Sequence, residues 1–572
     1  MAQGVLQIAV FCLLVVAVVP LLGGYMARVF RSEPTFLDAV AGPVERLAYR
    51  LLRVDVTRGQ DWKAYARSTI VFSLLGFLAL FAILRTQTVH PFYTAGFHSG
   101  TWDVSFNTAA SFVTNTNWQF YGGETTMTYF SQMAGLAVQN FLSGAVGLAV
   151  AAALIRGLAA RRTGDDGDTA GIGNFWQDVI RGSLYVLLPI SLVAAVVLVS
   201  QGVVQTLGPT VGGLARGPVA SQEAIKLLGT NGGGFFNVNS AYPFENPTQL
   251  SNLLEMLLIL CIPASLTYTY GRMVGNRRQG WAIFGAMSLL FLVSVAVVFL
   301  AERHGTPAQH LAGVVGPNLE GKEVRFGTTG SALWTAVTTV TSCGAVNAAL
   351  ESLTGIGGLV PMANLAYGES VFGGVGTGLY TMLLYVLLAV FIGGLMVGRT
   401  PEFLGKKIEA REIKLVSLGV LATPLIVLLG SGLALATRYG RPSIYAAGPQ
   451  GFSETLYAYM SQANNNGSAL AGYTGYLQPA PGNLGAHGVT FADVVGGLAM
   501  LGGRFLPIIL VLAIAGTLTG KRVAPIGLGT MRTDTPTFAG LLIGVVVLIG
   551  ALTFFPALLL GPVAQGLTDH LF

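Results

Sequence analysis

Charged side chains are scarce in this sequence. Asp, Glu, Lys and Arg make up 10% of the 572 residues, whereas a soluble domain usually carries about 25%. Hydrophobic residues make up 52%, and the mean hydropathy is +0.64. This composition excludes an ordinary soluble domain and predicts a polytopic membrane protein. The net charge of +6 does not indicate nucleic-acid binding, because membrane proteins collect Lys and Arg in their inner loops.

The sequence also lacks the residues for disulfide bonds, metal sites, phosphorylation and nucleotide binding. Three cysteines are too few for a disulfide framework, and the six histidines show no metal-ligand spacing. The Asp-Lys-Thr-Gly sequence of phosphorylated pumps is absent. Residues 316–323 nearly fit a phosphate-binding loop, but Glu323 replaces the hydroxyl that binds Mg²⁺. We therefore expect neither ATP nor Mg²⁺ on this chain; if ATP drives it, another chain hydrolyses the ATP.

Long apolar runs are abundant, and they form a fourfold pattern. Four times the chain shows an apolar helix, an outer segment with a short helix and a Gly/Asn/Thr turn, and a second apolar helix. The predicted helix pairs are 69–84 with 130–155, 184–204 with 250–270, 283–300 with 379–397, and 415–436 with 494–517. One more run precedes them (5–25) and one follows (538–560). The sequence thus predicts an all-α polytopic membrane protein with about ten transmembrane helices, built from four helix–pore loop–helix repeats in a pseudo-fourfold arrangement plus one extra helix at each end.

This pattern also divides the chain. The predicted segments are an extra N-terminal helix with its inner loop, four repeats, and a C-terminal helix: 1–67, 68–162, 163–278, 279–411, 412–522 and 523–572. The basic residues alternate with the spans. The inner clusters include Arg156/Arg161/Arg162/Arg181, Arg272/Arg277/Arg278, Arg399/Lys406/Lys407/Arg411/Lys414 and Lys521/Arg522/Arg532. Because inner loops are rich in Lys and Arg, we expect both termini on the outer side.

The four turns are the candidate site, and short helices at 105–113, 222–228, 333–340 and 455–463 lead into them. The candidate residues are Thr114, Asn115, Thr116, Asn117 and Gln119; Thr230, Asn231, Gly232, Gly233 and Gly234; Thr341, Ser342, Cys343 and Gly344; and Asn464, Asn465, Asn466 and Gly467. Glycine lets main-chain groups approach a ligand closely, and rings of carbonyls can replace the water shell of a monovalent cation. The alternative is four unrelated surface loops. Asn117 stands where we expect the equivalents Gly233, Gly344 and Gly467, so the ring should be asymmetric, with Asn side chains supplying oxygens.

A second group of residues is expected below the turns. Arg504 lies deep in a span, where charges usually mark ion paths; the alternative is an anchor for backbone carbonyls. Gly374, Gly376 and Gly378 crowd the start of helix 379–397, which suggests a broken or movable gate, or else close helix packing. Arg399 is grouped with these path residues, and Glu255 and Glu369 are expected to reach water at outer helix ends.

The turn sequences resemble those of a known family. Residues 228–237, 341–347 and 464–469 closely resemble the potassium-binding A subunit of Kdp-type potassium-transporting ATPases, as do 318–327, 372–376 and 398–407. The likeness covers essentially the whole chain. It implies that K⁺ is the bound ion and that the protein belongs to the superfamily of potassium transporters with four channel-like repeats. It also implies a bacterial inner-membrane complex with a P-type ATPase B subunit, a single-span C subunit and a small F subunit. An intramembrane tunnel is then expected to pass K⁺ to the ATPase subunit.

Two rival functions remain open at this point. A stand-alone Trk/Ktr-like potassium channel or symporter would share the four-repeat plan, but not the extra first and last spans. A non-transporting membrane scaffold would leave the four polar turns unexplained. Beyond membrane lipids and these subunits, no nucleic-acid partner is expected.

Overall fold

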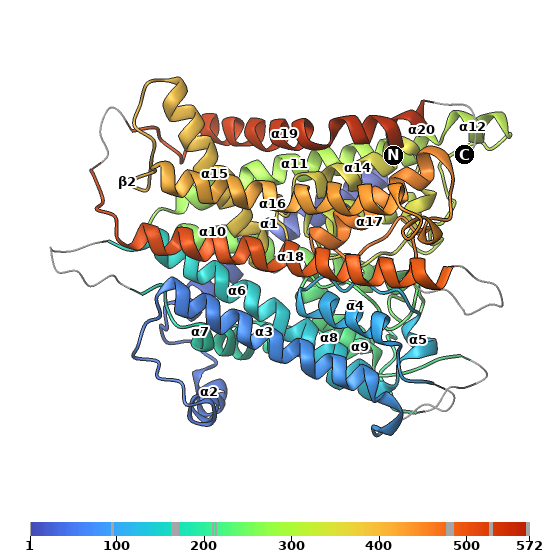
Figure 1. Ribbon diagram of the computed structural model, residues 1–572, viewed down its shortest axis with the longest axis horizontal. Helices are drawn as coiled ribbons and strands as arrows, with labels where there is room; N and C mark the ends of the chain where they lie inside the picture. Colours follow the sequence, from blue (N-terminus) through green and yellow to red (C-terminus); the bar gives the residue numbers. More distant parts are fainter. Residues whose placement is uncertain are drawn as a thin grey trace.

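The computed structural model describes residues 2–92, 97–161, 171–208, 211, 214–475, 485–525 and 530–567. In this part the chain is almost entirely helical, and the two-residue strands β1 (Glu402–Phe403) and β2 (Lys406–Lys407) form its only sheet, an antiparallel pair. Ten of the described helical segments are long and apolar enough to span a membrane. They run side by side across the view in Figure 1. The predicted all-α fold and the number of spans are therefore confirmed.

Each of the four repeats contains two spans with a short helix and a turn between them. The first spans of repeats 1, 3 and 4 are α3 (Trp62–Arg85), α11 (Arg277–His304) and α16 (Ala410–Ala436). The first span of repeat 2 is a continuous helix made of α7 (Phe175–Arg181), η3 (Gly182–Leu187) and α8 (Leu188–Ser200). The second spans are η2 (Ser131–Ala137) with α6 (Val138–Ala159), α10 (Gln249–Met273), α14 (Gly355–Ala366) with α15 (Thr377–Met396), and α18 (Gly485–Thr519). The short helices, here called the pore helices, are α4 (Trp102–Val113), α9 (Val219–Leu228), α13 (Gly327–Val340) and α17 (Gly448–Ala463).

One helix flanks the repeats at each end of the chain. The first is α1 (Ala2–Phe30); the other, α19 (Pro536–Leu558), continues into η7 (Leu559–Val563) and α20 (Ala564–Gly566). The hydroxyl of Thr269 in α10 donates to the carbonyl of Gly23 at 3.0 Å, and a Cβ at Gly23 would lie 2.5 Å from the Ser265 carbonyl. Glycine thus lets α1 approach α10 closely. Short connecting helices complete the chain: η1 (Gln87–Val89), α5 (Gly123–Thr126), η4 (Asn239–Ala241), α12 (Pro307–Leu311), η5 (Leu350–Ser352) and η6 (Arg441–Ser443).

The pore helices lie inside the protein rather than against lipid. Ten of the twelve residues of α4 are buried, including Asn107, Thr108 and Ser111, and α9 buries even Glu223 and Lys226. Helices of this length cannot span a bilayer, and backbone that ends at membrane depth must be surrounded by protein or line a cavity. The ring of longer helices provides that surrounding.

The helix that we predicted over 379–397 in repeat 3 is present as α15, which spans Thr377–Met396. The shorter helix α14 precedes it, and residues 367–376 separate the two. Gly368, Phe372, Gly373 and Gly376 in this segment all have positive φ, from +58° to +86°. L-residues rarely adopt such φ values, and none occurs in an α-helix. The glycines therefore lie at the start of α15, as predicted, and the segment before it separates α15 from α14.

The end of the protein that we predict to be the inner one carries basic residues and one helix that the sequence analysis missed. Arg156 pairs with Asp178 at 2.6 Å, and Arg181 pairs with Glu45 at 3.0 Å. Glu45 belongs to α2 (Asp38–Leu52), which lies within the stretch that we had interpreted only as a polar inner loop. In Figure 1, α2 and β2 lie at the left, whereas the N-terminus, α20 and the labelled pore helices α4, α9 and α17 lie toward the right. Val40, Leu47 and other apolar side chains of α2 are exposed, which is typical of a helix at a membrane surface.

Candidate functional site

The four pore helices end in the same way. Their C-caps are Thr114, Gly229, Thr341 and Asn464. Two residues beyond each cap, a backbone N–H donates to a carbonyl five residues earlier. These bonds are Thr116 to Ser111 (2.9 Å), Asn231 to Lys226 (2.8 Å), Cys343 to Thr338 (3.0 Å) and Asn466 to Ser461 (2.8 Å). The recurrence of one local geometry in all four repeats excludes four unrelated loops.

The backbone beyond each cap also follows one pattern. Positive φ angles occur at the first and third residues after the cap: Asn115 and Asn117, Thr230 and Gly232, Ser342 and Gly344, and Asn465 and Gly467. Asn tolerates this conformation better than most L-residues do. Asn117 can therefore take the place that glycine has in the other turns.

This geometry corrects the predicted alignment of the second turn. We expected the turn to begin at Thr230 and Asn117 to match Gly233. The structure places the cap at Gly229 and matches Asn117 with Gly232, one residue earlier. The error arose because the sequence Thr-Asn resembles the start of the other turns, whereas α9 ends one residue before it.

The four turns meet in a closed ring. A Cβ at Gly232 would lie 2.0 Å from the Cys343 carbonyl oxygen, one at Gly344 would lie 1.9 Å from that of Asn466, and one at Gly467 would lie 2.0 Å from that of Thr116. Asn117 closes the circle, since its Nδ2 donates to the Gly232 carbonyl at 3.0 Å. The order is repeat 2 to 3 to 4 to 1 and back to 2. A side chain at any of the three glycines would displace the carbonyl of its neighbour.

Amide side chains hold neighbouring turns together. Asn115 Nδ2 donates to the Thr230 carbonyl at 3.0 Å, and Asn465 Nδ2 donates to Thr116 Oγ1 at 2.8 Å. Gln119 and Gly234 exchange two hydrogen bonds, at 2.9 and 3.2 Å. The asymmetry that we predicted for the first turn is thus present. Asn115 and Asn465 donate to neighbouring turns through their nitrogen atoms, and Gln119 binds the second turn through both its nitrogen and its oxygen. The oxygens Asn117 Oδ1, Asn231 Oδ1 and Asn465 Oδ1 are buried and have no protein partner among the described residues.

The broken span of repeat 3 lies directly below the second turn. The Val375 N–H donates to Thr230 Oγ1 at 2.8 Å. A Cβ at Gly376 would lie 2.0 Å from the Gly147 carbonyl of α6, and one at Gly378 would collide with the Phe372 carbonyl. Gly374 is less crowded; its N–H donates to Glu369 Oε2 at 3.3 Å. Gly376 and Gly378 therefore need to be small because of close packing, and the segment that they belong to contacts the ring.

Arg504 lies in the same region. It is 2% exposed, its Nη1 donates to Thr377 Oγ1 at 2.5 Å and its Nη2 to the Ser143 carbonyl at 3.4 Å. No carboxylate of the described residues lies within ion-pair distance of it. The guanidinium therefore lies between α6, α15 and α18 without a direct ion pair, although Glu369 is near enough to interact with it electrostatically. Arg399, by contrast, is exposed beyond the inner end of α15, and the structure does not bring it to the turns.

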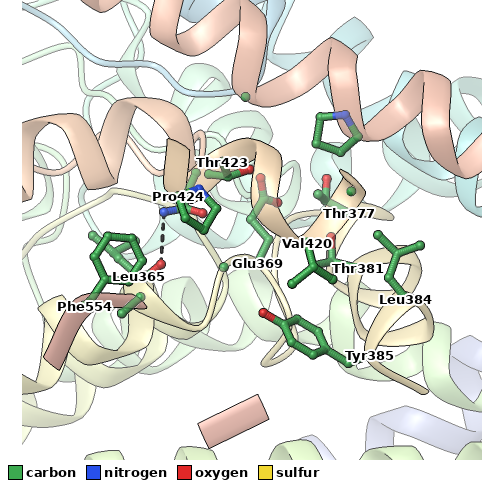
Figure 2. A pocket seen from close by; sticks show the side chains of 16 residues that line it. Leu365, Glu369, Thr377, Thr381, Leu384, Tyr385, Val420, Thr423, Pro424 and Phe554 are labelled. Carbon is green, nitrogen blue, oxygen red and sulfur yellow. Dashed lines mark hydrogen bonds between the residues drawn. The ribbon is translucent and has the colours of Figure 1, made fainter. Parts of the chain in front are cut away.

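A small cavity lies beside the fourth turn. Its volume is about 30 Å³, and about 10–15 Å³ is enough for one water molecule. Glu369, Thr377 and Asn464 supply polar groups to its wall, and Val420 and Phe554 are among its apolar neighbours. Figure 2 shows Glu369 and Thr377 together with Thr423 around this space. Because Thr377 also binds Arg504, the cavity and the guanidinium share one wall.

Two expectations about carboxylates are wrong. Glu255 is 0% exposed and Glu369 is 7% exposed, so neither reaches water at a helix end. Lys226, which is 0% exposed behind the second turn, was not considered at all. The available signal was its position: an ionisable residue in the short helix before the turn must be buried if the turn lines a cavity. Asn140 and Ser143, which bind Asn117 and Asn115, carried no sequence signal.

Known proteins resemble this chain along its whole length. A family described as "Potassium-transporting ATPase A subunit" matches residues 9–567. A "Potassium-transporting ATPase potassium-binding subunit" of Methylobacterium radiotolerans is 52% identical over 574 aligned residues, covering 99% of this chain and 97% of that protein. A protein of the same description from Granulibacter bethesdensis is 51% identical, covering 99% and 98%. The potassium transporter TrkH from Vibrio parahaemolyticus superposes with a TM-score of 0.49 at 16% identity, over 77% of this chain and 84% of that one.

Proposed function

The chain belongs to the family of potassium-transporting ATPase A subunits, and from this premise we propose that it binds K⁺ from the outer side in the ring of four turns and passes the ion to an ATP-hydrolysing partner chain. The full set of turn residues named above forms the filter. The chain itself is the potassium-binding subunit of a potassium-transporting ATPase.

The closed ring is the observation that carries this proposal. Backbone carbonyls of Thr116, Cys343 and Asn466 each lie against a glycine of an adjacent repeat, and such oxygens can replace the hydration shell of K⁺. The turns 114–119, 229–234, 341–346 and 464–469 contain no Asp or Glu. Protein sites for Ca²⁺ and Mg²⁺ generally use carboxylates. The donor set therefore favours a monovalent cation.

We extend the proposal to the path below the ring. In it, the segment 367–376 blocks straight passage inward, Arg504 repels any cation that enters below it, and the ion leaves sideways through the cavity beside Glu369. The carboxylate in the wall of that cavity supports this route. We assign this cavity to the beginning of the tunnel, segment 367–376 to the gate, and Arg504 to the barrier against leakage.

The remaining assignments rest on family membership. The partners are a P-type ATPase B subunit, a single-span C subunit and a small F subunit, in a bacterial inner membrane. The basic clusters support an orientation with both termini on the outer side. K⁺ is the substrate ion, and neither ATP nor Mg²⁺ binds here.

The rival function is a stand-alone Trk/Ktr-like channel or symporter. The family match over residues 9–567 includes most of the extra spans α1 and α19, which favours the ATPase subunit. Purification from the native membrane distinguishes the two. The proposal requires an ATPase to co-purify with the chain, and a transporting chain without one would support the rival.

Ion-dependent thermal stability tests the binding site. A ligand at 100 times its Kd stabilises the native state by about 2.7 kcal/mol, so K⁺ should raise the unfolding temperature of the purified chain more than Na⁺ does. Gly232→Asp should abolish this effect, because its Cβ would meet the Cys343 carbonyl at 2.0 Å. Equal K⁺ stabilisation of parent and variant would place the ion elsewhere.

A further inference from the structure

Lys226 is a fully buried ammonium behind the second turn. Its Nζ lies 2.6 Å from the Gly233 carbonyl, 2.9 Å from Asn239 Oδ1, 2.9 Å from Glu245 Oε2 and 2.8 Å from Glu223 Oε2. We call these four residues and Lys226 the Lys226 cage. Burying such charges costs free energy even when they are paired. Apolar residues would fill the same space at less cost, so the cage is expected to serve the turn that it touches.

The two carboxylates of the cage tie the turn to the segment that follows it. Glu245 accepts from Lys226 with one oxygen and from the Phe236 N–H, at 2.8 Å, with the other. Glu223 likewise binds Lys226 and accepts from the Ser240 hydroxyl at 2.8 Å. Every carboxylate oxygen of the cage therefore has a donor. The Gly233 carbonyl is the one turn carbonyl that the ammonium contacts.

In two other repeats, the carbonyl at the equivalent position also accepts a hydrogen bond from its own pore helix. Gly233 is the fourth residue after its pore-helix cap, and its equivalents are Trp118, Ala345 and Ser468. Ser111 Oγ donates to the Trp118 carbonyl at 2.9 Å, and Trp334 Nε1 donates to the Ala345 carbonyl at 2.7 Å. In repeat 4 the Tyr457 hydroxyl instead bonds Ser468 Oγ at 2.7 Å. Each pore helix thus anchors this position of its own turn, and repeat 2 does so with a charged donor.

The second turn needs the strongest anchor. Gly232, Gly233 and Gly234 have no side chains with which to pack, and both Gly232 and Gly233 have positive φ. Three consecutive glycines have more conformational freedom than any other turn residues. A hydrogen bond from an ionised donor is roughly twice as strong as one between neutral groups.

We propose that Lys226 is a positioning residue of the ion-binding ring. Its ammonium holds the Gly233 carbonyl toward the pore helix and thereby sets the direction of the adjoining Gly232 carbonyl. That direction in turn sets the discrimination between K⁺ and Rb⁺. This inference rests on the proposed function of the ring. It concerns how the ring keeps its dimensions, rather than which ion it binds.

The test compares two conservative substitutions in the purified full chain. Lys226→Arg keeps the charge but replaces the compact ammonium with a planar guanidinium that cannot reach the same oxygens equally. Lys322→Arg is the matched control. The side chain of Lys322 is also fully buried and pairs with Glu302 at 2.7 Å. It lies in the loop before α13, and its backbone acceptor is Glu320, not a turn residue. Apparent Kd values for K⁺ and Rb⁺ come from the ion dependence of the unfolding temperature.

Lys226→Arg should lower the ratio of the Rb⁺ to the K⁺ dissociation constant by about tenfold, which corresponds to ~1.4 kcal/mol. The ratio for Lys322→Arg should stay within about twofold of the parent value. A loss of stability alone would lower the unfolding temperature without ions but leave this ratio unchanged.

Two further variants make every outcome decisive. The neutral cage, Lys226→Met with Glu223→Gln and Glu245→Gln, removes the buried charges and should also lower the ratio. An unchanged ratio in both Lys226 variants would overturn the positioning role, as would failure of both to fold. Gly232→Asp separates this failure from that of the ring itself: if it also leaves ion binding unchanged, the proposed function fails, whereas if it alone changes binding, only the role of Lys226 fails.

Discussion

The ring geometry predicts a large effect for one added methyl group in the third turn. In Gly344→Ala, the new Cβ would lie 1.9 Å from the Asn466 carbonyl oxygen and 2.9 Å from the Ser468 nitrogen. Both are backbone atoms, so the fourth turn must move by about 1.5 Å to reach the 3.4 Å of an ordinary contact. Loss of one well-placed oxygen at a charged ligand costs about 1.5–3 kcal/mol. We therefore expect the Kd for K⁺ to rise by about 10- to 100-fold, and selectivity against Rb⁺ to fall.

A matched control separates this displacement from backbone strain. Gly344 has φ +86° and Gly275 has φ +81°, but a Cβ at Gly275 would meet nothing within 4 Å. An L-residue in this conformation costs about 1–2 kcal/mol at either position. Gly275→Ala should therefore lower stability to a similar degree and leave K⁺ binding unchanged. Equilibrium K⁺ and Rb⁺ titrations of both variants give the answer, and equal dissociation constants in the two would refute the ring geometry.

Three further predictions follow from the path and the partner. The isolated chain should bind K⁺ without hydrolysing ATP, and sustained ATPase activity of the pure chain would contradict the subunit assignment. Arg504→Met should leave K⁺ binding at the ring nearly unchanged and add passive K⁺ flux in vesicles, because a like charge at roughly 4–6 Å opposes K⁺ by about 3–4 kcal/mol at an effective dielectric constant near 20. Arg504→Lys is the charge-retaining control. If vesicles with Arg504→Met show no added K⁺ flux, the residue serves only to anchor Thr377. Glu369→Gln should slow ATP-driven transport by about tenfold with little change in the Kd for K⁺, since it removes the carboxylate of the cavity wall without touching the ring. A change confined to the Kd for K⁺ would instead place Glu369 at the ring.

The course of the second turn shows where local reasoning fails. Gly229 and Thr230 are adjacent, and the sequence offers no means of deciding which one caps α9. The decision depends on the hydrogen bond from Asn231 to Lys226 and on contacts with Asn115, which is more than a hundred residues away. Such contacts exist only after the repeats have assembled.

The burial of the ionisable residues likewise could not be predicted from the sequence. Glu369 and Glu255 lie near predicted helix ends, where reaching water costs least. In the structure, the break between α14 and α15 draws Glu369 inward beside the cavity, and α10 packs Glu255 against the buried region around Glu223. Lys226 is buried because its pore helix is enclosed by longer helices of repeats 1 and 2.

The sequence by itself determined that this is a membrane protein with ten spans, four equivalent polar turns and a charge at Arg504, because hydropathy, glycine content and basic clusters are local properties of the chain. Tertiary structure alone decided which carbonyl faces which glycine, where the third repeat breaks, and which carboxylates are shielded from water. Asn465 and Thr116 illustrate the reason: they are 349 residues apart and share a 2.8 Å hydrogen bond. The ring consists of contacts between repeats, and no single repeat contains the information that specifies them.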